Sequence, residues 1–127
     1  MNLEKVIFAF FIVLALTLNF GFFLGEIEHP DHHNIYELFA AIVINLIATI
    51  MKLGDRSHIG SVLLATSFVA DLHLIAAAIV WGFAAHVVAS GLSPDMMSTI
   101  VSLSGGALLA NLISVVLFVS DTVVTRR

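Results

Sequence analysis

The residue of this sequence with the clearest chemical potential is Asp71, which lies with His73 in a long apolar stretch at residues 65–78, ATSFVADLHLIAAA. An ionisable side chain is costly to bury in such a stretch, and inside a membrane it usually marks an ion or proton pathway. A carboxylate can coordinate a cation through its oxygens or accept a proton. Asp71 is therefore predicted to be an ion-coordinating or proton-accepting group.

Amide and hydroxyl side chains in the other apolar stretches are candidate neutral oxygen ligands for such a cation. At ~1.5 Å per helical residue, Asn19, Asp71 and Asn111 lie near the middle of their stretches, and Asn45 lies nearer to Lys52. The predicted ion pathway consists of Asp71, Asn45, Asn111, Asn19, Ser67, Ser104 and Glu37. Buried asparagines also often serve only as hydrogen-bonding groups between helices, and this structural role is the alternative.

A second set of polar and small residues is predicted on other helix faces. At about 100° per residue, His73 points about 200° away from Asp71 on a regular helix. If Asp71 faces the interior of its own bundle, His73 faces lipid or a second subunit, and a lipid-facing imidazole is costly. A homo-oligomer is therefore expected. The predicted second polar face or subunit interface consists of His73, His86, Ser102, Gly106 and Ala110.

The stretch at residues 26–36 is rich in histidines and carboxylates. Neutral imidazole together with carboxylate suits a divalent metal such as zinc, copper or nickel. The candidate ligands are His29, Asp31, His32 and His33. Their spacing matches no defined metal motif, so a solvated polar loop and a histidine-based pH sensor are the alternatives. Apart from this metal, no cofactor is predicted.

The composition indicates a membrane protein. Hydrophobic residues make up 60% of the 127 residues and charged residues only 11%, and the mean hydropathy is +1.09. A soluble domain of this length cannot bury so much apolar surface, so lipid must cover most of it. The absence of cysteine excludes thiol chemistry and disulfides. No basic stretch with interleaved aromatics points to nucleic acid as a partner.

The apolar stretches predict an all-α membrane protein, a single transmembrane domain over residues 1–127 with four membrane-spanning helices. The predicted spans are residues 6–24, 37–52, 61–89 and 97–119. Short connections between them predict an antiparallel up-down bundle. The basic residues are Lys5, Lys52, Arg56, Arg126 and Arg127, which all fall on one side of a four-span topology. By the positive-inside rule, both termini are expected in the cytoplasm.

Three runs of sequence resemble one known family. They are YELFAAIVINLIATIMKLGDRSHIG at 36–60, LLATSFVADLHLIAAA at 63–78 and SLSGGALLAN at 102–111. Together they resemble a family of small four-span bacterial inner-membrane proteins of unknown function. The resemblance implies a multi-pass protein of the bacterial cytoplasmic membrane, and it assigns no ligand or active residue.

These observations favour a homo-oligomeric cation channel or simple transporter for potassium, sodium or protons. The alternatives are a non-conducting accessory or scaffold subunit, and metal or pH sensing through the His-rich loop. No phosphate-binding loop, HExxH motif or nucleophile elbow is present, so an enzyme is not expected. The expected partners are the lipid bilayer, other copies of the chain, a monovalent cation and, in the accessory alternative, another membrane subunit.

Overall fold

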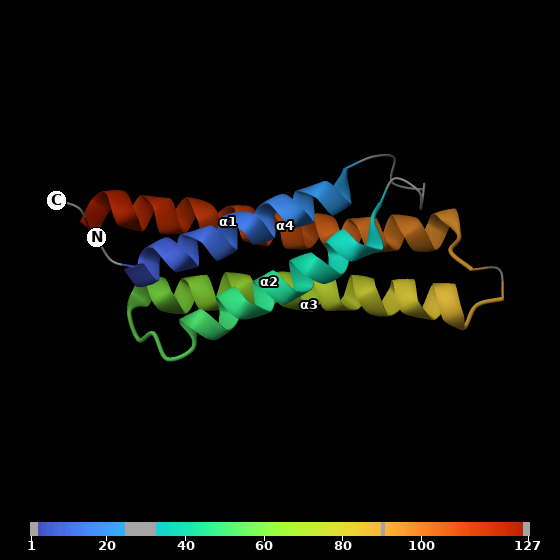
Figure 1. Cartoon of the computed structure of the whole chain (residues 1–127), viewed down its shortest axis with the longest axis horizontal. Helices are drawn as coiled ribbons and strands as arrows, with labels where there is room; N and C mark the ends of the chain where they lie inside the picture. The colour runs from blue at the N-terminus through green and yellow to red at the C-terminus, as the bar shows by residue number, and fades with distance from the viewer. Residues whose placement is uncertain (1–2, 25–32, 90, 126–127) are drawn as a thin grey trace.

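The computed structural model consists of four α-helices (Figure 1). It describes residues 3–24, 33–89 and 91–125. The helices are α1 (Leu3–Phe23), α2 (Ile35–Lys52), α3 (His58–His86) and α4 (Pro94–Thr125). Each is long and apolar enough to cross a membrane, and no strand occurs among the described residues. The prediction of an all-helical chain with four such helices is confirmed.

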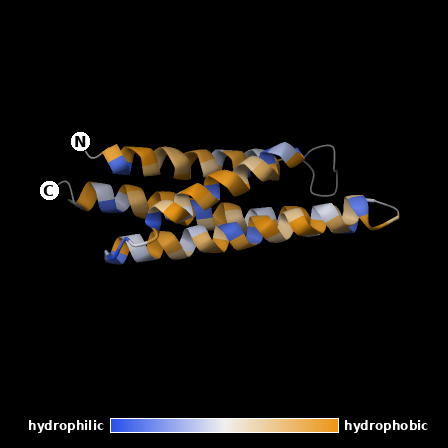
Figure 2. Cartoon of the chain, turned by 60° about the horizontal axis from the view of Figure 1, so that its bottom comes forward, coloured by the Kyte–Doolittle hydropathy of each residue, from blue (hydrophilic) through white to orange (hydrophobic). Residues whose placement is uncertain are grey.

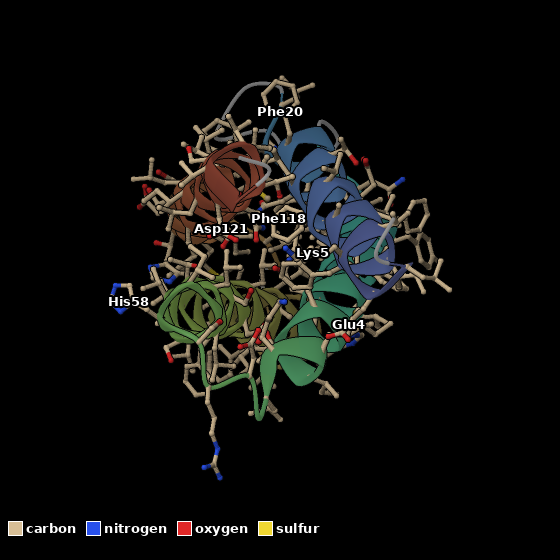
Figure 3. All side chains as sticks on the ribbon, turned by 90° about the vertical axis from the view of Figure 1, so that its left-hand side faces the viewer. Glu4, Lys5, Phe20, His58, Phe118 and Asp121 are labelled. Carbon is tan, nitrogen blue, oxygen red and sulfur yellow. The ribbon has the colours of Figure 1, made fainter. Side chains whose placement is uncertain are left out.

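Successive helices run in opposite directions along the long axis of the molecule (Figure 1). The start of α1, the end of α4 and the linker between α2 and α3 lie at one end, which we call the terminal end. The end of α1, the start of α2, the end of α3 and the start of α4 lie at the opposite end. An end-on view shows the four helices arranged as a ring (Figure 3). In this ring α1 packs against α2 and α4, and α3 packs against the same two helices. All four helices therefore share one interior.

Polar caps and turns extend the helices beyond the apolar stretches of the sequence. The α3 helix begins at His58 because the Ser57 side chain caps it, with its Oγ accepting a hydrogen bond of 3.0 Å from the Gly60 N–H. The α4 helix begins at Pro94, a residue suited to the first helical position, and continues to Thr125. The helices are thus longer at these ends than hydropathy alone predicts, because capping and backbone hydrogen bonds continue after the apolar residues end.

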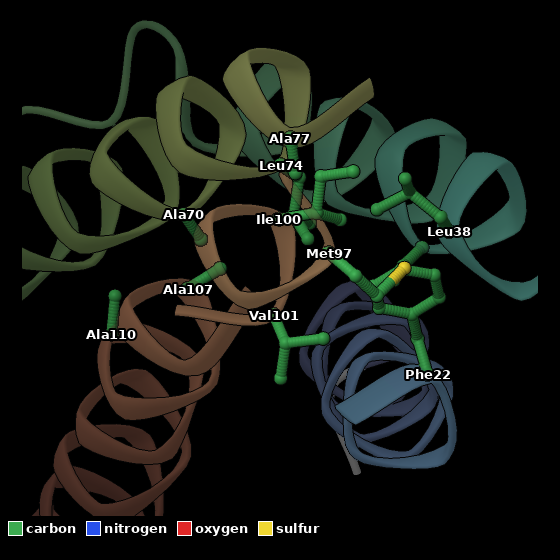
Figure 4. Packing of buried hydrophobic residues seen from close by; sticks show 11 residues of the cluster. Phe22, Leu38, Ala70, Leu74, Ala77, Met97, Ile100, Val101, Ala107 and Ala110 are labelled. Carbon is green, nitrogen blue, oxygen red and sulfur yellow. The ribbon is translucent and has the colours of Figure 1, made fainter. Parts of the chain in front are cut away.

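Two apolar clusters fill the interior at different heights. The outer cluster, nearer to the end opposite the termini, includes Phe22, Leu38, Leu74, Met97 and Ile100 (Figure 4). The inner cluster, at the terminal end, consists of Phe8, Ile12, Ala48, Leu63 and Phe118. Along each helix, buried polar residues occur between the members of the two clusters or beside them. The interior is therefore apolar above and below a polar layer.

The outside of the bundle is as apolar as the inside. Figure 2 shows hydrophobic residues along the length of all four helices. Large side chains such as Phe10, Ile79 and Phe83 are more than half exposed, at 60%, 66% and 56%. A soluble bundle keeps its apolar residues on one stripe of each helix, whereas a bundle in lipid can be apolar all round. This surface suits a protein whose solvent is the bilayer.

Candidate ion site in the bundle interior

The polar layer contains most of the residues that the sequence predicts for an ion pathway. Its buried members are Asn19, Asn45, Thr49, Ser67, Asp71, Ser104, Asn111 and Ser114, each exposed by 8% or less. They come from all four helices because one to three polar residues interrupt the inward face of each apolar helix. They do not meet at one point but form separate contacts between neighbouring helices.

Asp71 of α3 makes the contact with α2. Its side chain is only 4% exposed, and its Oδ2 lies 2.6 Å from the Thr49 hydroxyl. The other carboxyl oxygen, Oδ1, is buried without a hydrogen-bond partner, and among the described residues it is the only buried side-chain polar atom in that condition. A buried polar atom without a partner costs about 1–3 kcal/mol, and more if it is charged. Asp71 is therefore an incompletely paired group in the interior.

Thr49, whose hydroxyl contacts Asp71, is not among the residues predicted for the ion pathway. Its hydroxyl lies 2.9 Å from the carbonyl oxygen of Asn45, one turn earlier in α2, as well as beside Asp71. The Asn45 side chain donates to the Ala41 carbonyl of its own helix at 3.0 Å. Thr49 follows Asn45 by four residues and so shares its helix face. That spacing was the available signal, but only the packing of α2 against α3 identifies which residue of the face reaches Asp71.

Asn19 of α1 makes the contact with α4. With its amide oriented to match the surrounding donors and acceptors, it donates to the Ser104 carbonyl at 3.0 Å. Its oxygen accepts from the Leu108 N–H at 2.9 Å and from Nδ2 of Asn111 at 3.2 Å. Ser104 and Leu108 are four residues apart and belong to one turn of α4. The Ser104 hydroxyl donates within its own helix, to the Val101 carbonyl at 2.8 Å.

A pair of glycines lets the neighbouring helices approach this turn of α4. A Cβ on Gly105 would lie 2.9 Å from the Phe23 ring of α1, and a Cβ on Gly106 would lie 2.6 Å from the His73 ring of α3. Contacts that close leave no room for a side chain larger than hydrogen. Small residues at helix interfaces in membranes have this role of permitting close packing.

The expectation that His73 faces only lipid or a second subunit is incomplete, because its half-buried side chain also packs against α4 of its own chain. Its ring lies against Gly106 of the same chain, and its Nδ1 lies 2.9 Å from the Val69 carbonyl oxygen. Helical periodicity correctly turns His73 away from Asp71, but α4 occupies the position beside it. Part of the imidazole is therefore covered within one chain, and the rest stays exposed.

The other residues of the predicted second polar face are spread over different environments. Ala110 is buried, at 7% exposure, whereas Ser102 and His86 are exposed. His86 lies in the last turn of α3, far along the helix from the turn that carries His73. These residues therefore do not form one surface.

A further polar contact joins α3 to α4. The hydroxyls of Thr66 and Ser114 lie 2.5 Å apart. Ser67, the neighbour of Thr66, is buried at 2% exposure one turn before Asp71. The contact between Thr66 and Ser114 uses neutral groups only, so it needs no charge compensation.

The predicted metal ligands of the outer loop are only partly described. His29, Asp31 and His32 lie outside the described residues. His33 is buried at 3% exposure, and its Nδ1 lies 2.5 Å from the Phe22 carbonyl oxygen near the end of α1. The described residues contain no group of three or more histidine or acidic side chains arranged to hold a metal.

Glu37, predicted at the outer mouth, lies in the first turn of α2 and packs against α1. A Cβ on Gly21 would clash with Oε2 of Glu37, so the carboxylate occupies the space that glycine leaves open. The side chain is half-buried. Glu37 is therefore placed near the end opposite the termini, apart from Thr49 and Asp71.

The inward-facing cation of α2, Lys52, is paired at the terminal end. It is only 7% exposed, and its Nζ lies 3.6 Å from Oδ2 of Asp55 and 4.2 Å from the centre of the Phe8 ring. Hydrogen bonds from the Ser57 hydroxyl and N–H, followed by the charge of Lys52, lower the pKa of Asp55 below its ordinary value of 3.8. The contacts of Lys52 are thus made at the terminal end.

The comparisons place the chain in a family but assign no activity. The model of a family of unknown function, DUF6394, matches residues 32–122. This range is more than half of the chain, so the chain belongs to that family. It includes α2, α3 and most of α4, and therefore Asp71, Thr49 and the glycine pair. No curated protein matches the chain, and no solved structure matches it.

Proposed function

We propose that this member of a family of unknown function is a multi-pass protein of the bacterial cytoplasmic membrane that moves a monovalent cation across the bilayer. Asp71 is the binding group and Thr49 positions it. The observation that carries the proposal is the buried Oδ1 of Asp71, which has no hydrogen-bond partner. A purely structural contact would be served as well by a neutral side chain, without the cost of an unpaired carboxyl oxygen.

The two apolar clusters support a transporter rather than an open pore. On one side of the polar layer lie Phe22, Leu38 and Met97, and on the other lie Phe8 and Phe118, and all five are 8% exposed or less. A hydrated ion cannot pass through packed aromatic and aliphatic side chains. The arrangement therefore suits an occluded state, in which access to Asp71 opens to one side of the membrane at a time.

The proposed orientation places the terminal end in the cytoplasm. Lys5, Lys52 and Arg56 belong to the first turn of α1, the last turn of α2 and the following linker, which lie at that end (Figure 1). Positive charges of short loops are retained on the cytoplasmic side. Assembly into a homo-oligomer is a separate proposal, because the contacts of Asp71 and His73 are both made within one chain.

The test is ion flux into proteoliposomes that contain the full-length protein. Fluxes of protons, sodium and potassium are measured separately with ion-sensitive dyes for wild type, for Asp71→Asn and for Thr66→Val. The second variant removes an interhelical hydroxyl contact but leaves the carboxyl in place. We expect one of the three cations to show flux in the wild type and in Thr66→Val, and only the protein-free rate in Asp71→Asn. Equal flux in wild type and Asp71→Asn would remove Asp71 from the mechanism.

A non-conducting scaffold is the second candidate. The observation that favours it is that buried or half-buried side chains hydrogen-bond across three helix interfaces: Asn19 with α4, Thr49 with Asp71, and Thr66 with Ser114. Such contacts contribute about 0.6–2 kcal/mol each to helix association. A scaffold predicts no flux of any cation in the wild type, and a loss of partner subunits from native membranes after Asn111→Ala. Flux that depends on Asp71 would exclude it.

A further inference from the structure

The number of hydrogens available for the two contacts of the Thr49 hydroxyl indicates whether the Asp71 carboxyl group is protonated. The Thr49 hydroxyl lies 2.9 Å from the Asn45 carbonyl oxygen and 2.6 Å from Oδ2 of Asp71. A carbonyl and an ionised carboxylate can only accept, and a hydroxyl has one hydrogen to donate. Both short contacts are therefore full hydrogen bonds only if Asp71 supplies a second hydrogen. A protonated Oδ2 donates to Thr49, and Thr49 then donates to Asn45.

The same geometry gives an ionised Asp71 carboxylate too few hydrogen-bond donors. Its Oδ2 would share one hydrogen of Thr49 with Asn45, and its Oδ1 would carry charge with no donor at all. A buried carboxylate is normally stabilised by several hydrogen bonds or by a paired cation. In the protonated acid Oδ1 is an uncharged carbonyl oxygen, which tolerates the lack of a partner far better.

Among the residues that the structure describes, no buried charged group faces Asp71 from the helices around it. Among the buried residues of the described chain, only His33, Lys52 and Asp71 are titratable. Lys52 of α2 contacts Asp55 and Phe8, and His33 bonds to the Phe22 carbonyl. The buried side chains of α1 and α4 are apolar or neutral. On α3 itself, His73 is directed toward Gly106.

The neutral ligands that sodium or potassium would need are directed elsewhere. Such ions require several oxygens that replace their hydration shell. The Asn45 amide donates to Ala41, and Asn19 and Asn111 bond to each other on the α1–α4 side. The three predicted amide ligands therefore do not converge on Asp71, and the one hydrogen-bond contact of its carboxyl group is with the Thr49 hydroxyl.

We infer that the cation bound at this site is the proton, held on Oδ2 of Asp71 and donated in a hydrogen bond to Thr49. This inference rests on the proposed function, because it names the ion that the transporter moves. Uptake adds one proton to the carboxylate from one side of the membrane, and release returns it to water on the other side. No other bond is made or broken. Thr49 is a positioning residue that selects the oxygen on which the proton resides.

Infrared difference spectroscopy tests directly whether Asp71 carries a proton. Hydrated films of the full-length protein in lipid are perfused with buffers of neutral and alkaline pH, and the carbonyl stretch of protonated carboxyl groups is recorded. We expect a band at neutral pH that shifts in D2O and is lost in Asp71→Asn. In Thr49→Val the band should move to higher frequency, because the carboxyl loses its acceptor. In Thr49→Ser it should stay close to its wild-type position.

The matched control is Thr66→Val, which removes another interhelical hydroxyl and should leave the band unchanged. If Thr49→Val does not fold, Thr49→Ser and Asp71→Asn still decide the assignment. Absence of any Asp71-dependent band at neutral pH would overturn the inference. So would a rise in melting temperature with sodium chloride or potassium chloride that is absent in Asp71→Asn and not reproduced by choline chloride.

Failure of this inference is distinguishable from failure of the proposed function. An Asp71-dependent band without proton flux in proteoliposomes means that the proton is bound but not transported, so the proposed function falls and the assignment stands. Sodium or potassium flux that depends on Asp71, with no band, means that the transport proposal stands and the proton assignment falls.

Discussion

The contact between α1 and α4 and the contact between α2 and α3 both use polar side chains buried among apolar ones, yet only the first is complete. Asn19 donates to Ser104 and accepts from Leu108 and Asn111. Asp71 has one oxygen beside Thr49 and the other without a partner. An amide carries both donors and acceptors, whereas a carboxyl group donates only when protonated. We call the contact of Asn19 with α4 the closed contact, because all its polar groups are paired, and it stabilises helix packing. We call the contact of Thr49 with Asp71 the open contact, because its unpaired oxygen leaves a place for a ligand.

The largest expected effect comes from placing a carboxyl group in the closed contact. In Asn19→Asp the group that donates to the Ser104 carbonyl becomes an acceptor, and a second carboxyl is buried. We expect the free energy of unfolding to fall by about 3 kcal/mol. Unfolding in mixed micelles with increasing SDS measures this value. A variant as stable as the wild type would show that the two contacts tolerate a carboxyl equally and would remove the distinction between them.

Removing one member of the closed contact should have a smaller effect. In Asn111→Ala, Asn19 loses one of its donors but keeps the Leu108 N–H at 2.9 Å. We expect a loss of about 1 kcal/mol in the same unfolding experiment, with ion flux unchanged. The control is Leu109→Ala, since Leu109 is 60% exposed and lies outside the contact. Abolished flux in Asn111→Ala would place Asn111 in the ion pathway, as the sequence suggests.

Replacing the carboxyl group of the open contact by an amide should change stability least among the buried positions. The amide of Asp71→Asn can still donate to or accept from Thr49, and it carries no charge. We expect the free energy of unfolding to stay within about 1 kcal/mol of wild type, although flux is lost. A decrease comparable to that of Asn19→Asp would instead indicate that Asp71 acts chiefly in helix packing.

The smallest effect on stability is expected for Asp55→Asn, which removes a carboxylate that accepts several hydrogen bonds. Hydrogen bonds from Ser57 lower its pKa below 3.8, so the folded state favours the charged form. Its stabilising contribution is present above that pH and is lost as the pH falls through the lowered pKa. Because the Asp55 side chain is partly exposed to solvent, at 32%, the change should be small. Melting curves between pH 5 and about pH 2 should decline less in Asp55→Asn, and identical curves would contradict the assignment.

Much of the helical architecture could be predicted from the sequence, because the apolar stretches are long and are interrupted by turn and cap residues. Glycines with positive φ, Gly54 and Gly91, mark two of the connections. The ends of α3 and α4 were harder to predict, because the Ser57 cap and the residues after Val119 continue the helices beyond the apolar stretches.

The candidate site could be predicted only in part. Asp71 is recognisable because a carboxyl in an apolar stretch is costly, whatever it touches. Thr49 carries no such signal, since a threonine in a membrane helix is common and inexpensive. The environment of His73 was predicted incompletely, because the sequence shows that it points away from Asp71 but not that Gly106 lies in that direction.

The sequence by itself thus determined that the chain forms four helices suited to a bilayer and that Asp71 is the costly group among them. Length and hydropathy suffice for this, because both depend on each helix separately. Only the tertiary structure decided that Thr49 reaches Asp71 and that Asn19 reaches Ser104 and Leu108. The physical reason is that helical periodicity gives the angle between side chains of one helix, whereas the rotation and height of each helix relative to its neighbours depend on how all four pack together.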